Sequence, residues 1–105
     1  MKIAITSSGD STDAKFDLRF GRAAYFCVYD TSNGSTQFIA NEQCDAQGGA
    51  GTKAAEKMIE LGVKRIISGD FGPKAKDLLN QFKIQMVMLD DANSTVGVII
   101  DKLSV

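Results

Sequence analysis

The chain has 105 residues, a net charge of −1, and apolar and charged fractions of 44% and 24%, which are those of an ordinary globular domain. Its Lys and Arg residues are scattered rather than gathered into a basic stripe, which argues against a nucleic-acid partner. No apolar run approaches the roughly 18 residues of a membrane helix, and the N-terminus has the pattern of a strand rather than of a signal peptide. We therefore expect a single cytoplasmic domain over residues 1–105.

The first part of the chain predicts three strands, over residues 2–7, 25–30 and 35–40. These segments are rich in β-branched and aromatic residues. The Asn33–Gly34 pair between the last two is typical of a tight hairpin turn, so we expect those two strands to be antiparallel.

The pattern then changes to one of helices alternating with strands. A first helix is expected to begin with Thr52 as its N-cap and to end at Gly62, which suits a left-handed C-terminal residue. A second is expected to begin at Pro73, because proline is favoured in the first turn. The apolar residues that fall at helical spacing in these two segments are Ala55, Met58 and Ile59, and then Ala75, Leu78, Leu79 and Phe82.

Strands over residues 64–68 and 84–89 follow these two helices. A last helix, with Asn93 or Ser94 as its cap, is expected because apolar residues again recur at helical spacing, although its β-branched residues would also suit a strand. Its apolar face consists of Val96, Ile99, Ile100 and Leu103.

This element order predicts an α/β fold with a five-stranded mixed sheet, strand order 3-2-1-4-5, and about three helices. Right-handed crossovers place the first, fourth and fifth strands side by side and parallel, and the hairpin extends the other edge. The strand order reverses between the first and fourth strands. Ligands of open α/β sheets bind at such a point, beyond the carboxyl ends of the strands.

Two loops and a helix N-terminus are expected to meet there. Residues 7–23 and 69–75 follow the first and fourth strands, and the glycines Gly48, Gly49 and Gly51 precede or open the first helix. Unpaired N–H groups and the helix dipole attract anions, and glycine lets the backbone approach a ligand closely. The simpler alternative is that these glycines only form a turn before a helix.

Three further side chains could contribute to an anion site. Arg19 and Arg22 would supply planar donors, or they are solvated surface charges. Cys44 lies in a polar loop where nearby positive charge would favour its thiolate, whereas Cys27 lies within a strand and is expected to be buried. A single cysteine supplies a single metal ligand, so a metal at Cys44 would need ligands of its own or from a second chain.

The sequence offers little for catalysis. It has no histidine, which excludes Ser–His and Cys–His nucleophiles. Asp10 and Asp70 follow the first and fourth strands and could form a metal-binding pair, but aspartate is also common in turns. The first strand has no internal acid of the kind expected in a ribonuclease-H-type nuclease. We therefore predict no enzymatic activity.

Several segments together are familiar over nearly the whole length. They are MKIAI at the start, FGRAAYF at 20–26, GGAGTKAAE at 48–56, LGVKRIISGDFGPKA at 61–75 and the terminal helix. With these segments the sequence resembles the dinitrogenase iron–molybdenum cofactor biosynthesis family, which includes NifX-like proteins and the C-terminal domains of NifB. Members commonly have histidine before "FGR" and before "GGAG", where this chain has Arg19 and Gln47.

The resemblance implies a ribonuclease-H-like three-layer sandwich without nuclease activity. It also implies binding or carriage of a small anionic metal–sulfur cofactor or precursor, with molybdenum, iron or copper, and a cofactor-assembly protein as a partner. The alternatives are an interaction module without a cofactor and a phosphate- or nucleotide-binding domain. The expected cofactor-binding residues, with Cys44 also as the metal ligand, are Arg19, Gly21, Arg22, Cys44, Gln47, Gly48, Gly49, Gly51, Gly69 and Gly72.

Overall fold

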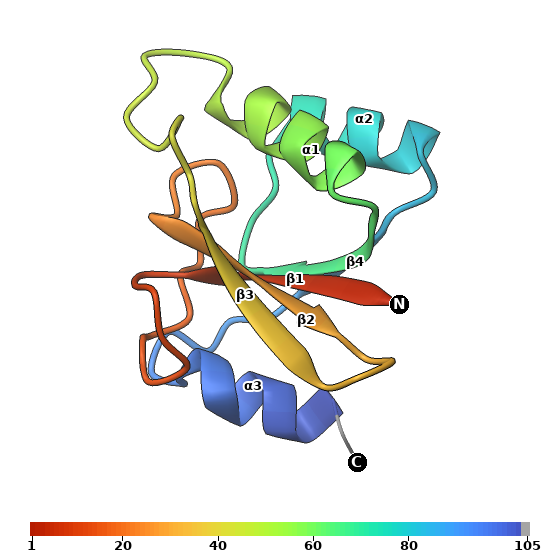
Figure 1. Ribbon diagram of the computed structural model, residues 1–105. Helices are drawn as coiled ribbons and strands as arrows, with labels where there is room; N and C mark the ends of the chain where they lie inside the picture. Colours follow the sequence, from red (N-terminus) through yellow and green to blue (C-terminus); the bar gives the residue numbers. More distant parts are fainter. Residues whose placement is uncertain (104–105) are drawn as a thin grey trace.

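The computed structural model of the protein describes residues 1–103, which form five strands and three helices. Figure 1 labels them on the ribbon. In chain order they are β1 (Lys2–Ser7), β2 (Tyr25–Asp30), β3 (Ser35–Ala40), α1 (Ala50–Glu60), β4 (Val63–Ser68), α2 (Pro73–Gln81), β5 (Gln85–Met88) and α3 (Val96–Leu103).

The strands form one sheet in the order β3-β2-β1-β4-β5, which confirms the predicted order. The central strand β1 is antiparallel to β2 and parallel to β4, so the sheet is mixed. Strands β2 and β3 pair antiparallel along their whole length, as the hairpin signal predicted. Strand β5 pairs parallel with β4 at the opposite edge.

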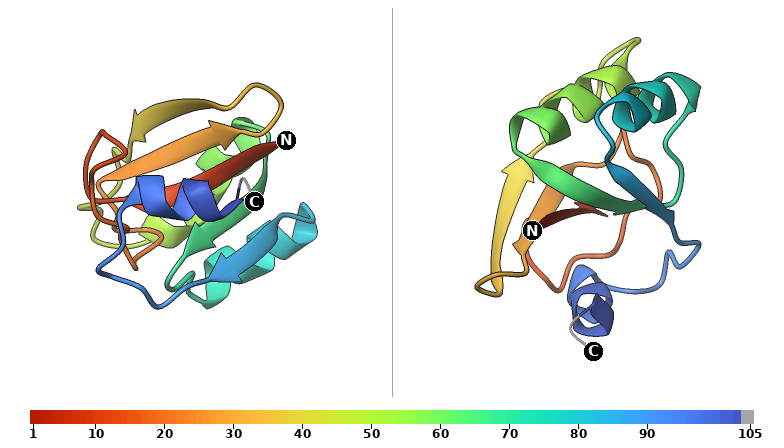
Figure 2. Two further views of the ribbon diagram at one scale, coloured as in Figure 1. Left: turned by 90° about the horizontal axis from the view of Figure 1, so that it is seen from below. Right: turned by 90° about the vertical axis from the view of Figure 1, so that its right-hand side faces the viewer.

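The helices cover both faces of this sheet. Helices α1 and α2 lie on one face and α3 lies on the other, which gives three layers (Figures 1 and 2). The α/β class and the three helices are therefore confirmed, while the ribonuclease-H-like assignment stays a prediction. Within residues 1–103, no helix is long and apolar enough to cross a membrane.

The sheet separates two apolar cores. Because side chains alternate across a strand, each inner strand contributes to both. In β2, Phe26 faces the core under α1 and α2, and Cys27 faces the core under α3. In β4, Ile66 and Ile67 divide in the same way. Strands β1, β2 and β4 therefore need apolar residues on both faces, which is why their sequences read as apolar runs.

Two predicted helix starts were wrong. Helix α1 begins at Ala50 with Gly49 as its N-cap, rather than after Thr52, because the backbone of Gly49 adopts a left-handed conformation and no side-chain cap is used. Helix α3 is capped by Thr95, whose hydroxyl accepts a hydrogen bond from the N–H of Val98 at 3.3 Å, rather than by Asn93 or Ser94.

Other boundaries moved by a residue. Strand β4 begins at Val63, and β5 is limited to Gln85–Met88. Phe82, expected on the apolar face of α2, is 53% exposed, because the helix ends at Gln81 and the chain leaves the helical path at Phe82. The Cys27 side chain is buried, as predicted.

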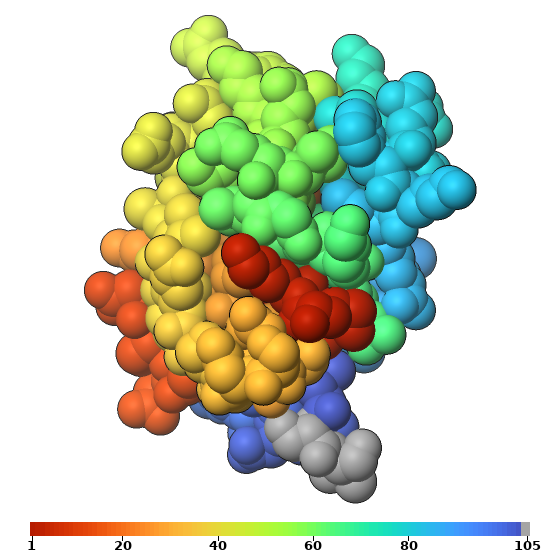
Figure 3. Space-filling model, turned by 45° about the vertical axis from the view of Figure 1, so that its right-hand side comes forward, coloured from red at the N-terminus to blue at the C-terminus, as the bar shows by residue number. Residues whose placement is uncertain are grey.

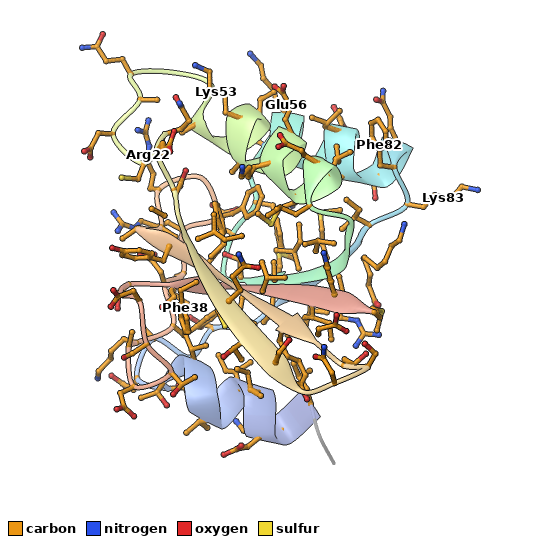
Figure 4. All side chains as sticks on the ribbon, viewed as in Figure 1. Arg22, Phe38, Lys53, Glu56, Phe82 and Lys83 are labelled. Atoms are coloured by element: carbon orange, nitrogen blue, oxygen red, sulfur yellow. The ribbon has the colours of Figure 1, made fainter. Side chains whose placement is uncertain are left out.

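The end of α2 places an unfavourable residue in a left-handed turn. The N–H of Lys83 bonds to the carbonyl of Asn80, and the N–H of Ile84 bonds to that of Leu79, which is a Schellman motif. Lys83 occupies its left-handed position, with φ of 57°, where glycine is normally preferred. Figure 4 shows its side chain projecting into solvent. In α1 the matching position is Gly62.

We predict that Lys83→Gly raises the free energy of unfolding, by about 0.5–1 kcal/mol, because it removes the steric cost of a left-handed side chain. Gly62→Ala should lower it by a similar amount, and urea unfolding followed by circular dichroism measures both. Destabilisation by Lys83→Gly would mean that the lysine side chain contributes more than its backbone conformation costs.

Candidate functional site

A cavity of about 380 Å³ lies where the strand order reverses. Three segments line it: residues 19–22 after β1, residues 49–51 at the start of α1, and residues 70–72 after β4. The loops after β1 and β4 lie side by side here, since the N–H of Phe20 bonds to the carbonyl of Asp70 at 3.1 Å. The convergence expected from the sheet topology is therefore present.

Two helix N-termini open into this cavity. Gly49 caps α1 with φ of 72°, and Gly72 caps α2 with φ of 76° and ψ of 154°, a conformation accessible essentially to glycine alone. Neither helix has a side-chain cap or an acidic residue in its first turn. The first-turn N–H groups are therefore left for water or an anion, and both helix dipoles favour negative charge at this point.

Two glycines are required for the close packing around the cavity. A Cβ atom on Gly21 would lie 2.7 Å from the backbone nitrogen of Gly51, so only glycine lets residues 19–22 contact the first turn of α1. A Cβ atom on Gly69 would lie 2.7 Å from both the carbonyl oxygen and the Cβ of Leu18. Gly69 therefore allows the loop after β1 and the loop after β4 to pack closely, although it does not itself line the cavity.

Arg19 is held at the rim by a carboxylate. Its Nε and Nη2 atoms each lie 3.2 Å from a different oxygen of Asp17, and this hydrogen-bonded pairing raises the pKa of the Arg19 guanidinium above its ordinary value. The Asp17 side chain is only 9% exposed, while that of Arg19 is 67% exposed. Arg19 is thus a fixed, permanent cation whose charge is partly offset by its partner.

Arg22 makes different contacts. Its Nη1 donates to the carbonyl oxygens of Cys44, at 3.1 Å, and Ala46, so it binds the loop that joins β3 to α1. Figure 4 shows Arg22 beside that loop. Among residues 1–103, the rest of its guanidinium has no partner, which leaves Nε and Nη2 available to an anion in the cavity that Arg22 also lines.

Two buried phenylalanines, which no sequence pattern singled out, pack beneath the cavity. Phe20 and Phe71 are 1% and 3% exposed, and their ring centroids lie 5.2 Å apart. The carboxylate of Asp70, a candidate for a metal-binding pair in the sequence, accepts the N–H of Gly72 at 3.3 Å.

The other expected site residues lie near the cavity without lining it. Cys44 is half-buried, Gln47 and Gly48 are exposed, and all three belong to the loop before α1. Cys44 interacts electrostatically with Arg19, so it is close to the rim. Within residues 1–103, no group of three or more Cys, Asp or Glu side chains is placed to hold a metal ion.

A second and larger cavity, of about 510 Å³, lies between the end of β3 and the side of α1. Figure 3 shows the yellow surface of β3 next to the green surface of α1. Its walls carry both Glu56 and Lys57, and neither helix N-terminus opens into it. The smaller cavity is therefore the better candidate for an anion site, because uncapped N–H groups and two arginines meet there.

Comparison with known proteins gives one family. The sequence model described as "Dinitrogenase iron-molybdenum cofactor" matches residues 1–104. The apo form of the orange protein from Desulfovibrio gigas is similar in structure, with a TM-score of 0.89 and 31% identity over 98% of this chain and 86% of that one. A Thermotoga protein provisionally described as a NifB protein has a TM-score of 0.83 and 30% identity, with the same coverage. An uncharacterized protein of Methanocaldococcus jannaschii is 29% identical over 82% of this chain and 72% of its own length.

The two cysteines should differ sharply in reactivity. Burial raises the pKa of the Cys27 thiol to about 11, so it is protonated and shielded at pH 8, whereas Cys44 is half-buried in a loop. We predict that a thiol reagent titrates one equivalent rapidly in the native protein and a second only after unfolding. The Cys44→Ser variant should lack the fast phase. Rapid reaction of two thiols in the native protein would contradict this assignment.

Proposed function

Because the chain belongs to the dinitrogenase iron-molybdenum cofactor family, we propose that it binds and carries a small anionic metal–sulfur cofactor, or a precursor of one, in the cavity between the N-termini of α1 and α2. The observation that carries the proposal is the meeting of two glycine-capped, otherwise uncapped helix N-termini in one cavity. The orange protein is similar over nearly the whole chain and is described in its apo form, which supports a bound group in that relative.

The electrostatics of the cavity favour an anion through the backbone more than through the arginines. Asp17 partly offsets the charge of Arg19, and Asp70 adds a carboxylate to the residues that line the cavity. The remaining positive contributions are Arg22 and the two helix dipoles, each equivalent to about half a charge. Backbone N–H groups fit a compact anion closely because Gly51, in the first turn of α1, has no side chain of its own.

The apolar residues beneath the cavity favour sulfur over oxygen in the cargo. Phe20 and Phe71 belong to the buried core, so their rings lie behind the cavity and do not touch a bound group. A thioanion is larger, more polarisable and less strongly hydrated than an oxyanion, so it loses less hydration in a site backed by apolar groups. Backbone N–H groups set over an apolar core therefore suit a molybdenum–sulfur or iron–sulfur anion.

Carriage without chemical change is part of the same proposal. The groups that would contact the cargo are backbone N–H groups and a guanidinium, neither of which transfers protons near neutral pH. In this proposal Cys44, whose carbonyl oxygen Arg22 binds at 3.1 Å, adds one thiolate ligand to a copper- or iron-containing cargo. A cofactor held mainly by hydrogen bonds can be released and transferred to another protein. The expected recipient is a cofactor-assembly protein.

The first test adds a methyl group to a glycine that lines the cavity. Gly51 lies in helical conformation, and a Cβ there would make ordinary contacts of 3.6 Å with Ala75 and the carbonyl of Phe71, so Gly51→Ala should fold normally. We predict that it weakens binding of tetrathiomolybdate about tenfold, because the methyl keeps the anion from charge-assisted hydrogen bonds. Calorimetry without oxygen measures the affinity.

The matched control is Gly48→Ala. A Cβ at Gly48 meets nothing within 4 Å, and Gly48 does not line the cavity, so this variant should bind like the wild type. Equal affinities for the two alanine variants and the wild type would place the site elsewhere. Molybdate and phosphate serve as further probes: tighter binding of phosphate than of tetrathiomolybdate would favour a phosphate-binding domain instead.

The second test separates the contributions of Arg22 and Cys44. Arg22→Gln should lower the affinity for tetrathiomolybdate about tenfold, because one charge-assisted contact is lost. Arg65→Gln should not, because Arg65 lies in β4, bonds to Gln85 and does not line the cavity. Cys44→Ser should leave that affinity unchanged and lower the copper or iron retained after anaerobic reconstitution, which elemental analysis measures. Wild-type metal content in Cys44→Ser would exclude the thiolate as a ligand.

A further inference from the structure

Asn41 is a buried polar residue at the start of the loop between β3 and α1, and no property of the sequence singled it out. Its side chain is among the few buried polar groups, with 7% of its surface exposed. Its Nδ2 donates to the carbonyl oxygens of Gly21, at 3.0 Å, and Ala23, at 2.9 Å. Its Oδ1 accepts the N–H of Gln43 at 3.2 Å, so all the polar atoms of the amide are used.

These contacts are the counterpart of those made by Arg22. Gly21 and Ala23 are the two neighbours of Arg22 in the chain, so Asn41 fixes the backbone on both sides of that arginine. Arg22 in turn donates to the carbonyls of Cys44 and Ala46, which follow Asn41. Each side chain thus binds two carbonyl oxygens of the loop to which the other belongs. We call this reciprocal arrangement of Arg22 and Asn41 the clasp.

The two halves of the clasp differ in burial. The hydrogen bond from Asn41 to Ala23 is buried and its bond to Gly21 is partly buried, whereas both bonds of Arg22 are exposed. A buried donor that loses its partner is left unsatisfied, while an exposed one is resolvated by water. Asn41 therefore provides the permanent half of the clasp, and it holds the Arg22 backbone whether or not the guanidinium keeps its loop contacts.

From this geometry we propose that Asn41 is a positioning residue of the anion site, which acts by fixing the backbone of Arg22, a residue that lines the cavity. The proposal rests on the proposed anion-binding function. An arginine loses much side-chain entropy when it is ordered by a ligand, so one that is already held binds more tightly. Gly21 is also fixed by Asn41, and Gly21 is where residues 19–22 contact the first turn of α1.

Binding in a double-mutant cycle distinguishes positioning from general support of the fold. In the otherwise wild-type protein, which keeps Arg22, Asn41→Ala should weaken tetrathiomolybdate binding about fivefold, because the ligand must then order the Arg22 guanidinium. In the Arg22→Gln background the same change should weaken it less than about twofold. Asn41→Ser, which retains one short donor, provides the milder variant if Asn41→Ala does not fold.

The matched control is Ser68→Ala. Ser68 is also buried and hydrogen-bonded, to the Thr6 hydroxyl at 2.9 Å, but within residues 1–103 none of its hydrogen bonds reaches Arg22 or its loop. This variant should lower the melting temperature without changing the affinity. Equal losses of affinity from the Asn41 change in both Arg22 backgrounds would overturn the proposal, since Asn41 would then act independently of Arg22.

A measurement without ligand tests the clasp itself. Amide hydrogen exchange of residues 42–46 should accelerate in both Asn41→Ala and Arg22→Gln, because each removes one half of the clasp, and should be unchanged in Arg65→Gln. Unchanged exchange in the two clasp variants would overturn the inference even if the protein binds no anion. Failure of the wild type to bind tetrathiomolybdate would instead overturn the proposed function, so the two failures are distinguishable.

Discussion

The parallel pairing of β1 with β4 is the contact on which the rest of the molecule depends. Parallel neighbours cannot be joined by a tight turn, so the chain must leave β1, build the β2–β3 hairpin on one side and return through α1 to enter β4. This route brings the loops after β1 and β4 to one edge of the sheet. It also directs the N-terminus of α1 to that edge, because α1 leads back to the start of β4. The cavity is therefore a consequence of strand order.

Close packing at this edge depends on residues without side chains. Gly21 lies against the first turn of α1, and Gly69 lies against Leu18, at distances that a Cβ atom would not allow. Gly49 and Gly72 cap the two helices with positive φ and have no side chain, so neither helix has a capping side chain over its first N–H groups. The same glycines that permit the fold thus leave backbone donors exposed, which is why the structural and binding interpretations of this sequence pattern are compatible rather than competing.

Family membership and local chemistry contribute different parts of the functional argument. The family match covers residues 1–104 and indicates a connection with the iron–molybdenum cofactor. It does not indicate how this chain, which has no histidine, would hold such a group. The residues around the cavity offer backbone N–H groups and the unpaired nitrogen atoms of the Arg22 guanidinium. Aromatic rings lie beneath the cavity, and Cys44 is nearby. A cargo bound in this way would keep its own metal–sulfur bonds and depend on the protein for orientation, charge balance and partial exclusion of water.

The sequence by itself determined the elements, their order and the sheet topology, because hydrophobic periodicity and glycine or proline signals are local and each strand of the sheet has a clear pattern. It also identified Arg19, Arg22 and the glycines as candidates, since their loops follow from that topology. It did not indicate that Asp17 holds Arg19, that Arg22 binds the carbonyls of Cys44 and Ala46, or that Asn41 lies buried beneath them. Some of those contacts join residues that are distant in the chain. In the others, packing sets the direction in which the side chain points. Backbone carbonyls carry no sequence signal, so only the tertiary structure decided which side chain would reach them.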